Sequence, residues 1–371
     1  MRIAYISLHW PRPRSSGIGR KIEEQISTWE QAGHTVRFFS HQACKNSSDE
    51  LVPGENFKFT AKSGFPGRIL TEVNRCWAVV QLLKALRDFS PDLIYLRWGM
   101  YVFPSHEIFK IAPVVVEINT NDVSQHVILG PLLSTYNRIT RSIYLRRACG
   151  FVFISNELAV NENFSVYRHP GIVIANGIDL SENLPVNAPS NTRPRLGFIG
   201  TPNMAWHGVD KLIRLAVLCP ELDIDVIGID KLDDGKVKPG NLFLHGYLDK
   251  EEARDALSKV DVGLGTLALH RINMNEASPL KTREYLAYGI PTIFPYKDSD
   301  LDDVSIDTIL KIPNSEDNIE QNWKMISEFT SQMRGKRVDR ELIARQIGSQ
   351  YKESSRLKFF QKCIIGTTSE I

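Results

Sequence analysis

The chain has 371 residues, of which 42% are apolar and 24% are charged. This length exceeds a single typical core, so we expect two domains, and the composition is typical of a folded globular protein rather than a disordered one. The net charge of +2 is too small to indicate binding to nucleic acid.

The cysteines indicate a reducing compartment, because they are odd in number and none forms a Cys-x-x-Cys pair. They are Cys44, Cys76, Cys149, Cys219 and Cys363. The sequence holds no apolar run long enough for a membrane span. The short apolar stretch at residues 3–8 runs into His9, Trp10 and Pro11, so it predicts a first β-strand rather than a signal peptide.

The first half of the chain alternates strands with helices, which predicts a doubly wound α/β domain. The predicted strands are residues 2–8, 36–40, 92–97, 113–118, 150–155 and 171–175. The predicted helices are residues 20–32, 68–89, 104–110, 131–148 and 156–163. We expect residues 41–66 to form a long loop.

The loop after the first strand contains Ser15-Ser16-Gly17-Ile18-Gly19-Arg20. Gly17 and Gly19 would let the backbone approach a phosphate at the start of the next helix. A plain tight turn would use the same glycines. The third glycine of the dinucleotide fingerprint is missing, which argues against a dehydrogenase.

Polar residues follow the strand at 113–118, where ligands bind in open α/β sheets. Asn119 and Asp122 are therefore site candidates, although a turn would also use them. The helix at 68–89 carries Arg75, Lys84 and Arg87. A basic helix can contact a membrane, but a solvated helix face is the commoner reason for such charges.

The composition changes at residues 176–195, which are rich in Asn, Pro and Ser, and a second α/β pattern follows. We therefore expect an N-terminal Rossmann-like domain at 1–180, a linker at 181–194, a second Rossmann-like domain at 195–345 and a C-terminal helix at 346–371. The predicted strands of the second half are residues 195–200, 224–228, 241–245, 261–266 and 292–295. Its predicted helices are residues 209–219, 249–258, 282–287, 315–332 and 338–365.

Residues 276–289 form the most informative stretch, because two carboxylates bracket a helix start. Ser278 suits the N-cap and Pro279 the first helical position, and the helix should stop near Gly289. Lys281 would add a mobile cation to a helix start that can hold a phosphate. At ~1.5 Å per residue, Glu276 and Glu284 would lie roughly 10 Å apart, a span suited to a nucleotide sugar. An ordinary capped surface helix is the alternative.

Taken with the order of the other segments, this stretch resembles the retaining GT-B-fold glycosyltransferases of family 4, and the resemblance covers almost the whole chain. Its most specific part is Glu276-x7-Glu284 followed by Tyr-Leu-Ala-Tyr-Gly-Ile-Pro. Weaker matches occur in family order at residues 17–19, 117–119, 152–158, 176–179, 196–200, 208–210 and 245–247. The resemblance implies a GT-B fold, in which two doubly wound Rossmann-like domains face each other across a cleft.

The resemblance also implies roles for the matching residues. Glu276 would contact the donor sugar, Glu284 the ribose, and the backbone at 279–281 and 17–19 the diphosphate, while 228–230 and 246–247 would line the base. The catalytic candidates are Glu276, Asn119 and Lys281. The donor-binding candidates are Glu284, Gly17, Gly19, Ser278, Pro279, Leu280, Thr201, His207, Asp230 and Tyr247.

The sequence departs from the family pattern at two places. Thr201 and His207 stand where many members have a phosphate-binding Arg and Lys, and Lys281 together with His207 would compensate. Asn119 stands where many members have a histidine, and an amide cannot shuttle a proton. A purely structural His207 is the alternative reading.

The implied activity is transfer of a sugar from a nucleoside-diphosphate sugar to an acceptor hydroxyl, with no metal and no cofactor. We expect a role in polysaccharide or lipid-linked glycan synthesis, in the cytoplasm or peripherally at the inner face of the membrane, where the basic first half would make contact. That half carries 20 Lys and Arg against 15 Asp and Glu over residues 1–180. The alternatives are a nucleotide-sugar epimerase of the same shape and a non-catalytic nucleotide-sugar-binding subunit.

Overall fold

The computed structural model describes residues 1–9, 17–44, 54–60, 64–127, 130–232, 235, 237–304 and 306–368. The chain divides into two compact units. Unit 1 contains Met1–Ala175 together with Gln350–Ile371, and unit 2 contains Asn176–Ser349. Among the described residues, no helix combines the length and the apolarity needed to cross a membrane.

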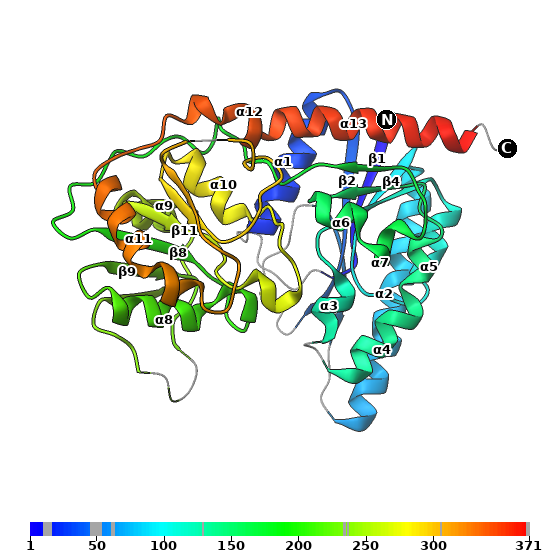
Figure 1. The fold of residues 1–371 in the computed structure, drawn as a ribbon. Coiled ribbons are helices and arrows are strands. Elements are labelled where there is room, and N and C mark those ends of the chain that lie inside the picture. The colour runs from blue at the N-terminus through cyan, green and yellow to red at the C-terminus, as the bar shows by residue number, and fades with distance from the viewer. Residues whose placement is uncertain are drawn as a thin grey trace. The chain divides into compact units, whose positions relative to one another are not determined.

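Unit 1 is built on a seven-stranded parallel sheet in the order β3-β2-β1-β4-β5-β6-β7 (Figure 1). The strands are β1 (Arg2–Ser7), β2 (Thr35–Cys44), β3 (Glu55–Thr60), β4 (Leu93–Arg97), β5 (Val114–Ile118), β6 (Gly150–Phe153) and β7 (Gly171–Val173). After β3 the chain returns to the other side of β1, so the order reverses between β1 and β4. Ligands bind at this kind of switch point in open α/β sheets.

The helices of unit 1 connect these strands. They are α1 (Gly17–Gln31), α2 (Phe65–Phe89), η1 (Ser105–Lys110), α3 (Asp122–Val127), α4 (Pro131–Thr140), α5 (Ser142–Leu145), α6 (Asn156–Val160) and α7 (Glu162–Ser165). The expected loop at 41–66 was wrong in part, because β2 continues to Cys44 and β3 pairs with it from Phe39↔Glu55 to Cys44↔Thr60. β3 was missed because its charged and polar residues make a half-exposed edge strand with little apolar signal.

The C-terminal helix α13 (Ser349–Thr368) packs into unit 1 from Gln350 onward. Its Leu357, Phe359 and Phe360 join the core formed by the first strands and Trp29 of α1. Buried polar contacts add to this packing. Trp29 Nε1 donates to Glu353 at 2.8 Å, and Arg356 donates to the Tyr95 hydroxyl at 2.6 Å.

Unit 2 repeats the doubly wound plan with six parallel strands in the order β10-β9-β8-β11-β12-β13. The strands are β8 (Arg195–Ile199), β9 (Asp223–Ile227), β10 (Leu242–Gly246), β11 (Val262–Leu264), β12 (Thr292–Phe294) and β13 (Ile309–Lys311). The helices are η2 (Ala205–His207), α8 (Val209–Leu218), α9 (Lys250–Ser258), η3 (Leu269–Ile272), α10 (Leu280–Ala287), α11 (Asn318–Met333), η4 (Arg340–Leu342) and α12 (Ala344–Ile347). The order reverses between β8 and β11, which is the switch point of this unit.

Two parallel sheets covered by helices confirm the predicted α/β fold class. The sequence missed β13, which has only three partly exposed residues. The helix expected at 282–287 is buried along its whole length, so α10 is a core helix of unit 2 and not the ordinary surface helix of the alternative interpretation.

Candidate functional site

The loops after β8 and β11 meet at the switch point of unit 2. The Leu267 N–H donates to the His207 carbonyl at 3.2 Å, and the Ala268 N–H donates to the Trp206 carbonyl at 3.1 Å. These bonds hold the η2 segment against the chain that leads toward α10. The switch point therefore brings the predicted Thr201 and His207 close to the strand that carries Phe198.

His207 and Thr201 bind each other. The Thr201 N–H donates to His207 Nδ1 at 3.0 Å, which places the ring proton on Nε2 in the neutral imidazole. The ring also stands edge-on to Phe198, with centroids 6.0 Å apart. In this arrangement the ring of His207 donates through Nε2–H, and the Thr201 N–H is already bound to the ring. Neither residue carries the charge of an arginine or lysine, so the two do not reproduce an Arg/Lys pair.

Lys281 lies on the same aromatic ring. Its Nζ is 4.1 Å from the Phe198 centroid, and its side chain is 8% exposed. Nζ has no hydrogen-bond partner among the residues that the structure describes. Burial lowers the pKa of Lys281 to about 7. The amine of Lys281, which we expected to be a mobile cation, is therefore buried, and its pKa lies near neutral pH.

The start of α10 differs from the expectation in its cap. Pro279 is the N-cap and no side chain caps the helix, so the prediction of Ser278 as N-cap and Pro279 as first helical residue was wrong. Ser278 Oγ instead accepts the Asn176 N–H at 2.9 Å and a hydrogen bond from Arg283 at 2.8 Å. The N–H groups of Leu280 and Lys281, as the first of the helix, have no intrahelical acceptor.

Arg283 organises this helix start, and the sequence reading did not single it out. It is fully buried, and it donates to Asp298 and Asp300 at 2.7 Å and to the Asn176 carbonyl at 2.8 Å. Burial alone would lower the pKa of Arg283, but Asp298 and Asp300 outweigh it and raise the pKa above its usual value. The Asp298-Ser299-Asp300 run could have signalled a partner for a buried arginine.

The two glutamates of the motif are both nearly buried, with Glu276 7% and Glu284 6% exposed. Glu276 lies in an extended segment that is held by paired backbone bonds, Ala277 N–H to the Lys297 carbonyl and Lys297 N–H to the Asn275 carbonyl, both 2.9 Å. The Ser299 hydroxyl donates to the Glu276 carboxylate. Ser299 was also missed, because nothing in its sequence context marks it.

Asp230 and Tyr247 stand on neighbouring loops that are bonded to each other. The Gly228 N–H donates to the Gly246 carbonyl at 2.6 Å, and the Gly246 N–H donates to the Ile229 carbonyl at 3.0 Å. Gly228 has φ +88°, and a Cβ there would lie 2.3 Å from the Gly200 carbonyl oxygen, so only glycine fits. These hydrogen bonds, and the close approach of Gly228 to Gly200, keep the ends of β8, β9 and β10 next to one another.

A cavity of about 620 Å³ opens beside these loops. It is lined by Pro202, Asn203, Met204, Ala205, Val209, Asp210, Ile229, Asp230, Lys231 and Leu232. Its volume is in the range of small-molecule sites. Of the predicted residues Asp230 lines the cavity. A larger cavity, about 760 Å³, lies elsewhere in unit 2 between residues 185–191 and α9.

One predicted residue of unit 1, Asn119, contacts a buried carboxylate. Glu117, at the end of β5, accepts from Lys21 of α1 at 2.7 Å and from Arg97 at the end of β4 at 3.1 Å. Asn119 Nδ2 donates to Glu117 Oε2 at 3.1 Å. Burial alone would raise the pKa of Glu117, but Lys21, Arg97 and Arg356 hold it well below its usual range.

This cluster fixes the amide of Asn119 and links it to the start of α1. Gly17 and Gly19 are the first and third residues of α1, so Gly17 lies about one turn before Lys21 and Gly19 lies two residues before it. Ser15 and Ser16 lie outside the described residues. Asp122 has a different role from the expected one. It is buried against Arg141 in a two-pronged ion pair with both distances 2.9 Å, and Asn137 also donates to it.

Comparison with known proteins gives one family match, which covers part of the chain. Residues 15–182 match the model of Glycosyltransferase Family 4. No curated protein matches the sequence.

Solved glycosyltransferases have a similar fold. One is a sucrose-phosphate synthase from Thermosynechococcus elongatus, with a TM-score of 0.67 and 15% identity over 98% of this chain and 99% of that chain. Another is the lipopolysaccharide outer core galactosyltransferase WaaB, with a TM-score of 0.64 and 16% identity over 98% of this chain and 100% of that chain. An alpha-glucosyltransferase solved with UDP-glucose and DNA is also similar, with a TM-score of 0.64 and 15% identity over 97% of this chain and 99% of that chain.

The expected fold is thus confirmed. Residues 15–182 match the glycosyltransferase family 4 model, and the chain as a whole has the GT-B-like fold of solved glycosyltransferases.

Proposed function

We propose that this chain is a retaining glycosyltransferase that moves a sugar from a nucleoside-diphosphate sugar to an acceptor hydroxyl. The observation that carries the proposal is Lys281. Its amine is buried at the start of α10 without a hydrogen-bond partner among the described residues, and Glu276 and Glu284 lie on either side of it in the sequence. A buried amine without a partner is costly, and a bound anion would supply that partner.

The diphosphate of the donor fits this position. The first N–H groups of α10 and the positive end of its dipole would bind the phosphate oxygens together with Lys281. As the bond between the anomeric carbon and the diphosphate breaks, negative charge grows on the leaving group, and these fixed groups would stabilise it. In this proposal Glu276 orients the sugar, Glu284 holds the ribose, and Asp230 and Tyr247 contact the base.

Two residues act through others in this proposal. Ser299 holds the Glu276 carboxylate, and Glu117 holds the Asn119 amide so that its Oδ1 faces away from Glu117 and can accept from a hydroxyl. The acceptor is a glycan or a lipid-linked glycan. The product would belong to surface polysaccharide or lipid-linked glycan synthesis.

Release of free nucleoside diphosphate tests the proposal. The protein is incubated with a donor that binds it and with glycan and lipid-linked glycan acceptors, and Glu276→Gln serves as the variant. We expect release that depends on acceptor and falls at least tenfold in Glu276→Gln, in line with the loss of a group that orients the reacting sugar. Tight donor binding without release over a broad acceptor screen would contradict the proposal.

That contradictory result would favour a non-catalytic nucleotide-sugar-binding subunit. One observation motivates this second candidate. Thr201 and His207 bind each other where many family members have a cationic pair, so part of the usual charge stabilisation is missing.

A further inference from the structure

Helix α2 of unit 1 exposes a row of apolar side chains. Ile69, Val73, Trp77 and Val80 are 58%, 58%, 63% and 40% exposed, and their spacing of four, four and three residues places them on one helix face. The opposite face packs into the sheet through Ala78, Val79, Leu82, Leu83 and Leu86. We call the four exposed residues the α2 stripe. This helix is thus apolar on two faces, and the residues that the structure describes cover one of them.

Helix α4 has a second row of the same kind. Leu132, Tyr136 and Ile139 are 87%, 40% and 70% exposed at a spacing of four and three residues. We call them the α4 stripe. A soluble helix with a solvated outer face would carry polar residues at these positions.

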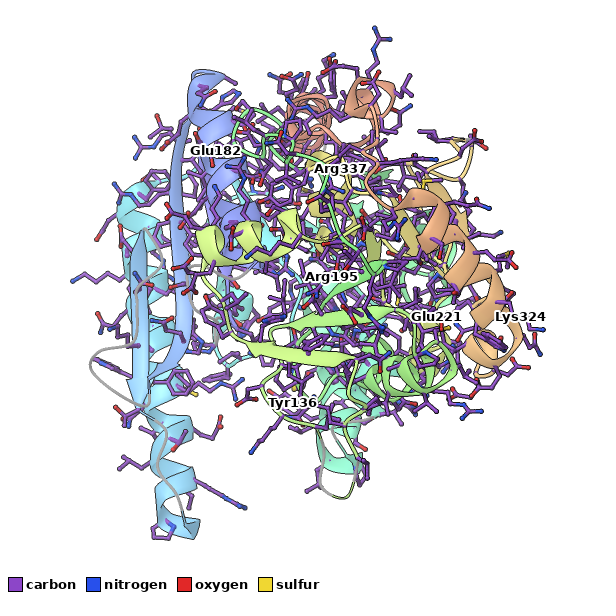
Figure 2. All side chains as sticks on the ribbon, turned by 90° about the vertical axis from the view of Figure 1, so that its left-hand side faces the viewer. Tyr136, Glu182, Arg195, Glu221, Lys324 and Arg337 are labelled. Atoms are coloured by element: carbon purple, nitrogen blue, oxygen red, sulfur yellow. The ribbon has the colours of Figure 1, made fainter. Side chains whose placement is uncertain are left out.

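The two helices lie at one end of unit 1. Both extend to the lower end of the unit in Figure 1, and Tyr136 of α4 is labelled in Figure 2. The charges of Arg75 and Glu72 on α2 act on the Tyr136 hydroxyl, which places the middle of α2 near α4. Two separate apolar rows at one end of a unit are more than the scattered apolar residues of an ordinary surface.

The charge around these rows is mainly positive. Residues 65–89 and 131–147 together contain eight Lys and Arg but only two Asp and Glu. The basic residues are Arg68, Arg75, Lys84, Arg87, Arg138, Arg141, Arg146 and Arg147. Two of them are paired with a carboxylate, Arg141 with Asp122 and Arg75 with Glu72. Lys84 and Arg87 continue the face of the α2 stripe, so its apolar part ends in two exposed cations.

An anionic membrane surface matches this combination. Apolar rows with Trp and Tyr partition into the boundary between headgroups and acyl chains, and flanking Lys and Arg bind anionic headgroups. A second copy of the chain fits less well, because pairing this face with itself would bring positive charge against positive charge. We propose that the α2 and α4 stripes dock unit 1 on an anionic lipid bilayer.

Vesicle sedimentation tests the proposal. Wild-type protein is mixed with vesicles of equal parts phosphatidylglycerol and phosphatidylcholine, or of phosphatidylcholine alone, at about 0.1 M salt, where surface charges still act over about 10 Å. We expect binding to the anionic vesicles, at least tenfold weaker binding to the neutral vesicles, and weaker binding as salt rises.

The decisive variant is Trp77→Ser combined with Leu132→Ser, which removes the most exposed residue of each stripe. The matched control is Val217→Ser combined with Val237→Ser, two exposed valines of unit 2 that are 55% and 85% exposed. We expect at least a tenfold loss of vesicle binding in the stripe variant and none in the control. All four side chains are at least half exposed, so neither variant should unfold.

Three results would overturn the proposal. They are no binding of the wild type to anionic vesicles, equal binding by the stripe variant, and self-association of the wild type that the stripe variant abolishes. Nucleotide binding is measured on the same samples. Because the predicted base, ribose and Lys281 contacts all belong to unit 2, the stripe variant keeps nucleotide binding, and a failure of the donor site is distinguished from a failure of membrane docking.

Discussion

At the residue scale, Lys281 determines how the candidate site responds to pH. Most buried lysines are paired with a carboxylate, which keeps the amine charged. The pKa of Lys281 is instead lowered by burial alone. A group of this kind is sensitive to any anion that enters its surroundings. Its state of charge is therefore a direct reporter of the proposed diphosphate position.

Substituting Lys281 with Met should change stability in a pH-dependent way. Because the folded-state pKa of about 7 lies below the ordinary value of 10.5, the unfolded chain binds more protons between these values, and the stability of the wild type rises with pH through that window. Below pH 7 the full cost of charging the buried amine is present. We expect Lys281→Met to be more stable than the wild type at pH 6 and to lose that advantage toward pH 10, measured by denaturant unfolding. A pH-independent difference would contradict the account.

The affinity of the wild type for nucleotide should fall with rising pH, whereas its stability rises. An anion favours the charged amine, so wild-type affinity for a nucleoside diphosphate should fall as pH rises above 7, while Lys281→Met should bind at least tenfold more weakly with little pH dependence. Calorimetric titration from pH 6 to 9 measures both. Equal affinity of the two proteins at pH 6 would show that Lys281 does not contact the nucleotide.

Arg283 illustrates a residue whose removal should unfold the site. Breaking a buried ion pair by deleting one partner typically costs about 3–5 kcal/mol. Arg283→Met leaves Asp298 buried without its cation and removes one of the donors to Ser278, so we expect a loss of unfolding free energy of that order. Exposed Arg254→Met in the same unit is the control and should change stability by less than about 0.5 kcal/mol. Similar stabilities for the two variants would contradict the assigned role.

At the element scale, α10 shows what a sequence can predict and what it cannot. Gly289 marked the end of the helix correctly, since the helix ends at Ala287 with Tyr288 as C-cap and Gly289 in the left-handed region. The cap at its start was wrong, because Ser278 accepts from Asn176, which lies 102 residues earlier in the sequence. Local capping preferences compete with such distant partners, and the sequence gives no sign of which will win.

Gly289 provides a test of the helix end. The Ile290 N–H donates to the Tyr285 carbonyl at 2.8 Å, which requires Gly289 at φ +77°, and a Cβ there would lie 3.2 Å from the Val338 carbonyl oxygen. Gly289→Ala should therefore lower the free energy of unfolding by about 1 kcal/mol or more. Gly240→Ala, where a Cβ meets open space, is the control and should have little effect. Chemical denaturation compares the two, and equal midpoints would contradict the role of Gly289.

The attachment of α13 to unit 1 gives a second element-scale test. Arg356 binds Glu353 at 2.8 Å and the Tyr95 hydroxyl at 2.6 Å in the interior. Arg356→Met leaves Glu353 with one cation fewer, so we expect a loss of about 3–5 kcal/mol, partly recovered when Glu353→Gln is added. Thermal unfolding of the single and double variants measures the coupling. Strictly additive losses would show that the two residues act independently.

At the scale of the whole molecule, the fold class was predictable because alternating apolar strands and amphipathic helices persist through both halves. β3 and β13 were not predicted, because an edge strand buries too few apolar side chains to produce a recognisable sequence pattern. The sequence suggests candidate site residues only where a local motif carries them, as at Glu276, Lys281 and Glu284. Ser299, Arg283 and Lys21 act through contacts made by folding, and single-sequence patterns do not report such contacts.

The central claim is that unit 2 binds a nucleoside-diphosphate sugar at α10, and donor binding tests it most directly. Thermal unfolding of the wild type and of Glu284→Ala is measured with UDP, GDP, ADP, CMP and their common sugar conjugates. The account predicts that one nucleotide stabilises the wild type, by roughly 2.7 kcal/mol at a hundredfold its dissociation constant, and that Glu284→Ala loses most of this effect. No stabilisation by any nucleotide, or equal stabilisation of both proteins, would contradict it.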